Sequence, residues 1–240
     1  MLDPVLQVIL LLRVLCGGEF ILKRGRVMKE WDDDYHIVEQ DYNPDWPLYA
    51  AVDFGYRNDW VWLWIQVDPM TRNVYVIGEH RFRERDTEFI ARYEIANHPL
   101  LTKLLAIYVD PSSPDDAAIL RRHLNTKTMS NTGGEIKLRL QLIRSALKRR
   151  PEHLPEDHPE KLPGLMIDHS CTKLIWEMRE GYRWPESAND MRNISEIPMD
   201  VDNHGPEALG RFFKGYMEQF SSAGTRQSRQ RSIGARRRAA

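Results

Sequence analysis

Strand-forming residues are concentrated in three neighbouring segments in the first half of the chain. They are "YAAVDFG" (49–55), "WVWLWIQVD" (60–68), in which large apolar residues alternate, and "NVYVIGEHRF" (73–82). The turn segment "PMTRN" joins the second of these to the third. Short connections between consecutive strands favour antiparallel pairing, so the pattern predicts a three-stranded meander.

The second half of the chain alternates between helical spacing and short apolar strands. Helices are expected at 86–99, 113–124, 133–150, 171–184 and about 206–220, and strands at 104–111 and 164–170. Asp86 is positioned to cap the first of these helices. A meander followed by alternating helices and strands predicts an α/β fold, with a mixed sheet flanked by helices. Neither GxGxxG nor GxxxxGK[ST] occurs, which argues against a dinucleotide fold and against a phosphate-binding loop.

The remaining segments divide the chain into three parts. Residues 1–18 are expected to be a helix and linker, residues 19–220 the main domain, and residues 221–240 a disordered basic tail. Within the main domain we expect a short strand pair turned at Gly25, an acidic connector at 32–47 and a Pro-rich surface loop at 151–163. The apolar run at 5–15 is too short to span a bilayer and contains Arg13, so no membrane partner is expected.

Composition and charge narrow the class of protein. The 240 residues suit one large domain with appendages, and the two cysteines match no metal-binding spacing, as is usual for reduced thiols in the cytosol. The tail holds six Arg and no acid, so residues 1–220 carry 28 Lys and Arg against 35 Asp and Glu, a net charge of −7. An acidic body binds a polyanion only if something neutralises its acids.

Two carboxylates occupy unusual places in the predicted strands. Asp53 interrupts an apolar strand and shares a face with the small residues Ala51 and Gly55, and Asp110 ends the strand at 104–111. Either acid alone is more often a cap or a turn former. Together on adjacent strands, their like charges would need a cation or a shared proton.

A third acidic group lies near the end of the main domain, in "IPMDVDNHGPEALGRFF". Asp200, Asp202 and Glu207 surround a helix start, where ordinary capping by Asp202 or Asn203 is the alternative. Three roles are open for His204 at this point: a solvent-facing residue, a hydrogen-bond partner of a neighbouring site residue, or a proton shuttle. Three acidic segments far apart in sequence suit two-metal phosphodiester hydrolysis with Mg²⁺ or Mn²⁺. This hypothesis requires the acids to converge and to be free of arginine salt bridges.

At these residues the chain resembles the nuclease domain of the large terminase subunit of tailed bacteriophages and prophages. The resemblance runs from about Glu19 to Phe220. Its blocks, in order, are "GEFILKRGRVMKEWDDDYHIV", "AVDFGYRNDWVWLWIQVDP", "IYVDPSSPDDAAILRRHLN", "GGEIKLRLQLIRSALK", "IDHSCTKLIWEMREGYRWPE" and "DVDNHGPEALGRFF". The complete ordered set is more specific than any single block. It implies a ribonuclease H-like fold.

The resemblance also assigns roles to individual residues. Asp53 matches the first metal-binding acid and Asp110 the second, and the third aligns best with Glu207, with Asp202 as a neighbour that could share the metal. His204 belongs to the same catalytic block. The chain departs from the family pattern by having Glu207 where Asp is usual, and Gly210-Arg211 where Arg directly follows Leu.

The implied activity is cleavage of double-stranded DNA with two Mg²⁺ or Mn²⁺ ions during genome packaging, in the cytoplasm of the bacterial host. The implied partners are a portal protein, a small terminase subunit and a packaging ATPase domain. A complete large subunit carries that ATPase before the nuclease, and this sequence has no Walker loop. The alternative is a non-catalytic DNA- or portal-docking module, left by a degraded prophage or silenced at Glu207. A transposase-like nuclease is disfavoured because no DNA-recognition domain is evident.

Basic segments are the candidates for phosphate contact. The candidate residues are Arg81, Arg83, Lys137, Arg139, Lys148 and Arg149. The alternative for each is an ordinary solvated surface. Trp60, Trp62 and Trp64 alternate at strand spacing, which predicts packing in the core more than stacking on bases.

Overall fold

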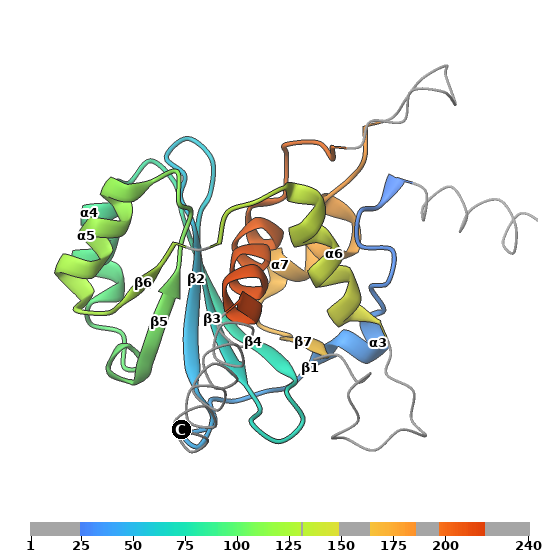
Figure 1. The fold of residues 1–240 in the computed structure, drawn as a ribbon, viewed down its shortest axis with the longest axis horizontal. Coiled ribbons are helices and arrows are strands. Elements are labelled where there is room, and N and C mark those ends of the chain that lie inside the picture. The colour runs from blue at the N-terminus through green and yellow to red at the C-terminus, as the bar shows by residue number, and fades with distance from the viewer. Residues whose placement is uncertain (1–24, 131, 149–163, 186–196, 219–240) are drawn as a thin grey trace, which may run out of the picture.

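The computed structural model describes residues 25–130, 132–148, 164–185 and 197–218 (Figure 1). The helix and linker expected within residues 1–18, the Pro-rich loop and the basic tail lie outside these ranges. Within them, no helix combines the length and the apolar character that crossing a membrane requires.

The centre of the molecule is a seven-stranded mixed sheet with the order β1-β7-β4-β3-β2-β5-β6. The strands are β1 (Ile37–Val38), β2 (Leu48–Asp53), β3 (Trp60–Val67), β4 (Val74–Phe82), β5 (Leu104–Tyr108), β6 (Thr128–Met129) and β7 (Leu165–Asp168). β2, β3 and β4 form the antiparallel meander, and parallel strands extend it on both sides. This confirms the predicted mixed sheet.

Helices cover both faces of the sheet (Figure 1). They are α3 (Asp33–His36), α4 (Thr87–Phe89), η2 (Ile90–Ile95), η3 (Leu101–Lys103), α5 (Pro114–Leu124), α6 (Ile136–Leu147), α7 (Thr172–Trp176), η4 (Glu177–Gly181) and residues 204–218. α4 and α5 lie on one side of the sheet, and α6, α7 and the helix at 204–218 lie on the other. The predicted cap is confirmed, because the Asp86 carboxylate accepts a hydrogen bond from the Phe89 N–H.

Strand β3 is buried along its whole length because both of its faces are covered. Trp60, Trp62 and Trp64 pack with α5 and η2 on one face of the sheet. Val61 and Leu63 belong to the core on the opposite face, together with α6 and the helix at 204–218. The tryptophans are therefore core residues, as their spacing predicts.

Three short features differ from the expectation. The connector at 32–47 contains α3 and the two-residue strand β1, and β6 was not expected. The first half of the strand pair expected around Gly25 lies outside the described residues, and in its second half Arg26 forms a bridge with Arg183. Strands of two residues are too short to carry a periodic signal, because their pairing partners place them.

Candidate active site

The two strand-end acids lie at the same edge of the sheet. Asp53 is the last residue of β2, and Asp110 follows β5 by two residues. β2 and β5 are parallel neighbours in which Ala51 is opposite Tyr108, so both carboxyl ends point the same way. The carboxyl ends of parallel strands are where sites assemble in α/β sheets.

The helix at 204–218 brings three further functional side chains to this edge. His204, Glu207 and Arg211 are spaced by three and four residues and so share one helix face. Phe212 and Tyr216, on its apolar side, stack against one another in the core and fix the helix on the sheet. The helix starts two residues earlier than its sequence pattern predicts.

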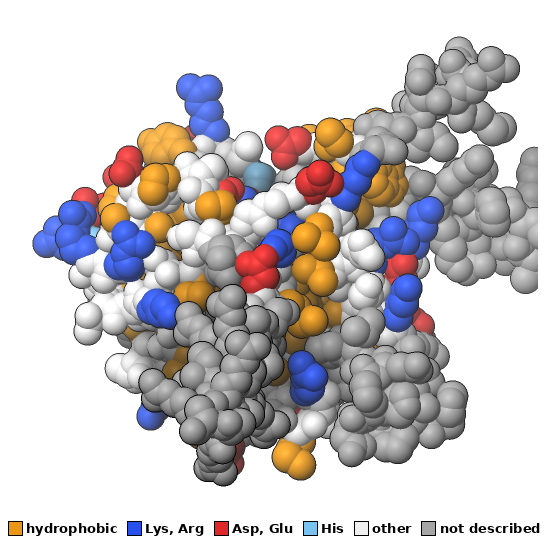
Figure 2. Space-filling model, in the orientation of Figure 1, with side chains coloured by type: hydrophobic (Ala, Val, Ile, Leu, Met, Phe, Trp, Pro, Cys, Tyr) orange, Lys and Arg blue, Asp and Glu red, His pale blue; other side chains and the backbone are white. Residues whose placement is uncertain are grey.

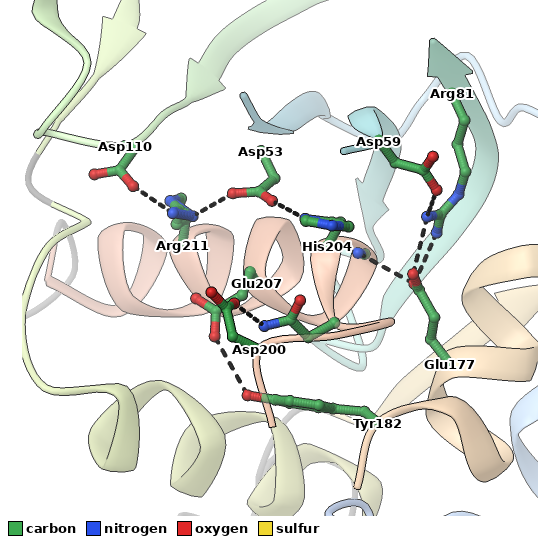
Figure 3. Close-up of polar contacts among 12 residues, drawn as sticks. Asp53, Asp59, Arg81, Asp110, Glu177, Tyr182, Asp200, His204, Glu207 and Arg211 are labelled. Carbon is green, nitrogen blue, oxygen red and sulfur yellow. Dashed lines mark hydrogen bonds and ion pairs between the residues drawn. The ribbon is translucent and has the colours of Figure 1, made fainter. Parts of the chain in front are cut away.

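Arg211 joins the two acids (Figure 3). Its Nη1 donates to Asp53 Oδ1 at 3.0 Å, and its Nη2 donates to Asp110 Oδ2. The Arg211 side chain is only 9% exposed. The requirement that the acids be free of arginine is therefore not met in this structure.

The other Asp53 oxygen faces His204, whose Nδ1 lies 2.9 Å from Asp53 Oδ2. This hydrogen bond raises the pKa of His204 more than burial lowers it. Burial raises the pKa of Asp110, but hydrogen bonds from Ser112 and the charge of Arg211 outweigh it, so the pKa lies below its usual value. Asp110 is accordingly ionised at neutral pH.

Glu207 points to a second arginine. Its Oε2 accepts from Arg139 Nη2 at 2.6 Å, and its Oε1 lies 3.5 Å from the Tyr182 hydroxyl. Burial, followed by the charge of Glu207, raises the pKa of Tyr182, so this phenol stays protonated and donates. Glu207 thus reaches the site edge with both oxygens already engaged.

Asp200 and Asp202 take different places. Asp200 lines the pocket beside the site and accepts from Asn203 Nδ2 at 3.1 Å. Asp202 does not line that pocket, and its carboxylate pairs with Lys173 Nζ at 3.0 Å. The left-handed backbone of Asp202, φ 51°, turns the chain into the helix. Asp200 is therefore the acid of this segment that lines the pocket, and the metal role expected of Asp202 remains a prediction.

The site opens into a pocket of about 370 Å³. Its lining includes Asp53, the loop at 54–58, Arg139, Asp200, Asn203, His204, Glu207 and Arg211. Among the described residues, no three His, Cys, Asp or Glu side chains come close enough together to form a ready-made metal centre. Asp53, Asp200 and Glu207 therefore line one pocket, and Asp110 is joined to it through Arg211, but together they do not form a chelating group in this structure.

Two of the basic candidates are largely buried. Arg81 pairs with Glu177, Glu79 and Asp59, and its side chain is only 14% exposed. Arg139 pairs with Glu207 and is 15% exposed. Three carboxylates engage the Arg81 guanidinium, which gives this residue a structural role, and its expected contact with DNA remains a prediction.

The other basic candidates are on the surface or outside the described residues. Arg83 is exposed although it pairs with Asp59, and Lys137 and Lys148 are exposed. Arg149 lies outside the described residues. On the face shown in Figure 2, groups of Lys and Arg alternate with acidic and hydrophobic ones rather than forming one stripe.

Arg211 is the residue of the candidate site that sequence reasoning missed. The signal was present, because a residue four positions after Glu207 on a helix must share its face. In the sequence, the shift of this arginine to position 211 is visible only as a departure from the family pattern. Its consequence in the structure is that the guanidinium points at the acids.

The fold is that of known nuclease domains. The chain aligns with the P22 large terminase nuclease domain at a TM-score of 0.57 and 10% identity, covering 81% of this chain and 93% of that one. It aligns with the large terminase nuclease of thermophilic phage G20c, solved with bound cobalt, at 0.51 and 11%, covering 79% and 96%.

A longer structure also matches. The large terminase of another thermophilic bacteriophage, solved in complex with ATP-gamma-S, aligns at a TM-score of 0.61 and 18% identity. The alignment covers 80% of this chain but only 46% of that one. No protein-family model and no curated protein sequence matches the chain. The likeness therefore lies in the three-dimensional fold, a ribonuclease H-like sheet with its flanking helices.

Proposed function

We propose that this chain is the nuclease domain of a phage large terminase subunit and hydrolyses phosphodiester bonds of double-stranded DNA with Mg²⁺ or Mn²⁺. The observation that carries the proposal is the meeting of Asp53 and Asp110 at the carboxyl ends of neighbouring parallel strands. The proposal also requires the Arg211 guanidinium, which lies between the two acids, to move aside when metal binds. The fold supports it, since this sheet is shared with the P22 and G20c nucleases.

The residues of the pocket fit a hard divalent cation. Asp53 and Asp110 already hold a positive group in the form of the Arg211 guanidinium, which stands in for a cation between them. Asn203 Oδ1 is buried and has no hydrogen-bond partner among the described residues, so a pocket-lining residue has one oxygen left to engage. Carboxylate and amide oxygens are the ligands that Mg²⁺ and Mn²⁺ prefer.

In this mechanism Asp53 and Asp110 would hold the metal, and Glu207 and Asp200, which line the pocket, would be further oxygen donors. A bound metal would supply an activated water and stabilise charge on the leaving 3′ oxygen. His204 orients the Asp53 carboxylate through Nδ1 and holds a proton at the pocket wall, where it can protonate the leaving oxygen. The use of two ions belongs to this proposal.

The proposed biological setting follows from the same family. The substrate is double-stranded DNA in the host cytoplasm, and the partners are a portal protein, a small terminase subunit and a packaging ATPase domain. The chain spans less than half of the large terminase solved with ATP-gamma-S, so the packaging motor is a proposed partner and not a property of these 240 residues.

A second candidate function is a non-catalytic module that binds DNA or the portal. Two contacts favour it, because Arg211 lies between Asp53 and Asp110 and Arg139 holds Glu207. In that case the arginines take the place of the metal permanently and the site has lost its chemistry.

Cleavage of supercoiled plasmid separates the two candidates. We expect the purified chain to nick plasmid with Mn²⁺, and Asp53→Ala to reduce the rate at least about a hundredfold, since a metal ligand is lost. Asp115→Ala, which removes an exposed acid on α5, is the matched control and should leave the rate unchanged. DNA binding without cleavage at any Mn²⁺ concentration would establish the non-catalytic module instead.

A further inference from the structure

The guanidinium of Arg211 occupies the space that a cation between Asp53 and Asp110 needs. It donates to one oxygen of each acid, and its side chain is almost completely buried (Figure 3). Two carboxylates at one edge of a low-dielectric core repel one another unless a positive charge lies between them. Arg211 supplies that charge from within the chain.

The position of Arg211 is set by the packing of its helix. Phe212 and Leu209 are fully buried beside it. A Cβ on Gly210 would lie 3.0 Å from Arg139 Cβ, so the helix at 204–218 and α6 are in close contact. The helix therefore cannot rotate to withdraw the guanidinium, and only the side chain can move. Arg211 also lines the pocket, which leaves its guanidinium room to turn outward.

We propose that Arg211 is a built-in competitor for the divalent metal: guanidinium and metal bind between Asp53 and Asp110 in a mutually exclusive way. The inference rests on the proposed nuclease function and specifies how its metal site is regulated. When the guanidinium leaves the acids it stays at the pocket wall, where it meets an arriving phosphate. Arginine is well suited to that exchange because its planar fork matches both carboxylate and phosphate.

The exchange predicts weak metal binding by the free protein. If Arg211 is paired with the acids most of the time, metal can bind only to the fraction of molecules in which the acids are unpaired. The apparent dissociation constant for metal is then the intrinsic constant divided by that fraction. Charge-assisted hydrogen bonds of this kind make that fraction about a tenth to a hundredth. Removing the guanidinium should therefore tighten metal binding about ten- to a hundredfold.

Calorimetric titration of the full chain with Mn²⁺ tests this directly. We expect Arg211→Gln to bind Mn²⁺ about ten- to a hundredfold more tightly than the wild type. Arg144→Gln is the matched control, because it removes the same charge from an ion pair with Glu30 outside the pocket. Its affinity should equal that of the wild type. Equal affinities in the wild type and Arg211→Gln would overturn the proposal, and so would tightening of the same size in Arg144→Gln.

A second measurement uses the wild type and does not depend on a variant's folding. The Nε–H signal of a guanidinium held in an ion pair is observed by NMR, and Arg211→Lys identifies the signal of Arg211. Titration with diamagnetic Mg²⁺ should shift and broaden this signal, while that of Arg144 stays unchanged. An Arg211 signal that persists unaltered at saturating Mg²⁺ refutes the exchange. Plasmid cleavage by the wild type is scored separately, so the nuclease function can stand when the competition fails.

Discussion

The position of a buried charged side chain in this protein is set by its ion-pair and hydrogen-bond partners. Glu177 is completely buried, and its carboxylate accepts from both terminal nitrogens of Arg81 at 2.9 and 2.7 Å and from the Gly205 N–H at 3.1 Å. Burial raises the pKa of Glu177, while the charge of Arg81 opposes that rise. The ion pair between Arg81 and Glu177 therefore anchors Gly205, the residue that follows His204.

Removal of the Glu177 charge should destabilise the whole domain. We expect Glu177→Gln to lower the free energy of unfolding by about 3 kcal/mol, because it leaves a largely buried guanidinium partly uncompensated. The matched control is Glu88→Gln, whose ion pair with Arg122 is exposed and should contribute less than about 1 kcal/mol. Urea denaturation measures both, and equal losses would show that burial of the Arg81 pair does not matter.

Two neighbouring histidines, His80 and His98, join strand β4 to the helical layer that covers it. His80 on β4 lies at 5.3 Å, ring to ring, from His98, which stacks on the buried Trp64. Burial lowers the pKa of His80, and the neighbouring His98 lowers it further. Because the folded-state pKa lies below the usual 6.5, the unfolded chain binds more protons just below pH 6.5.

Stability should consequently fall as the solution is acidified from pH 7 toward the lowered pKa of His80. His80→Gln removes this titration, so its free energy of unfolding should change less over the same pH range, by about 1 kcal/mol or less. Denaturant midpoints at a series of pH values measure the difference. Parallel pH profiles of wild type and variant would contradict the assignment.

Close packing between elements positions the helix at 204–218 on the sheet. A Cβ on Gly215 would lie 2.7 Å from Cδ1 of Tyr108, a fully buried ring at the end of β5. The ring cannot yield easily, because Tyr108 also packs edge-on against Phe212. Absence of a side chain at 215 is thus what lets the helix bring His204, Glu207 and Arg211 to the acids.

Gly215→Ala should be destabilising although alanine is the better helix former. We expect a loss of about 1–3 kcal/mol from overpacking, which exceeds the gain of about 1 kcal/mol in helix propensity. Gly25→Ala, where no described residue lies within 4 Å of the added Cβ, should be nearly neutral. Thermal unfolding of both variants decides, and a stabilised Gly215→Ala would mean that the helix can shift on the sheet.

At the scale of the whole molecule, the charge distribution limits how the chain could contact DNA. The body of the chain is acidic, and exposed basic side chains are separated by other groups on the face shown in Figure 2. If the chain binds DNA as proposed, we expect a modest number of individual phosphate contacts around the pocket. Each such contact releases counterions and makes binding depend on salt.

The logarithm of the DNA affinity should fall steeply with the logarithm of salt concentration. Lys137→Gln, next to the pocket residue Ile136, should reduce the slope by about 1, because one phosphate contact is lost. Lys103→Gln removes the same charge at the opposite end of β5 from Asp110 and should leave the slope unchanged. A flat salt profile for the wild type would exclude an electrostatic footprint.

The sequence by itself determined the mixed α/β sheet, the antiparallel meander, most of the helices and the positions of the strand-end acids. These features depend on local periodicity, on turns and on where an apolar strand stops, all of which are written in neighbouring residues. The strand ends of Asp53 and Asp110 could be found in this way because parallel strands end at one edge of a sheet.

Only the tertiary structure decided what the acids touch. The contact between Arg211 and Asp53 joins residues 158 positions apart, and that between Arg139 and Glu207 joins residues 68 apart. No local pattern specifies such pairs, because each depends on how a helix is rotated and seated against the sheet. The same reason explains why β1 and β6 were missed, since their partner strands, rather than their own two residues, hold them in place.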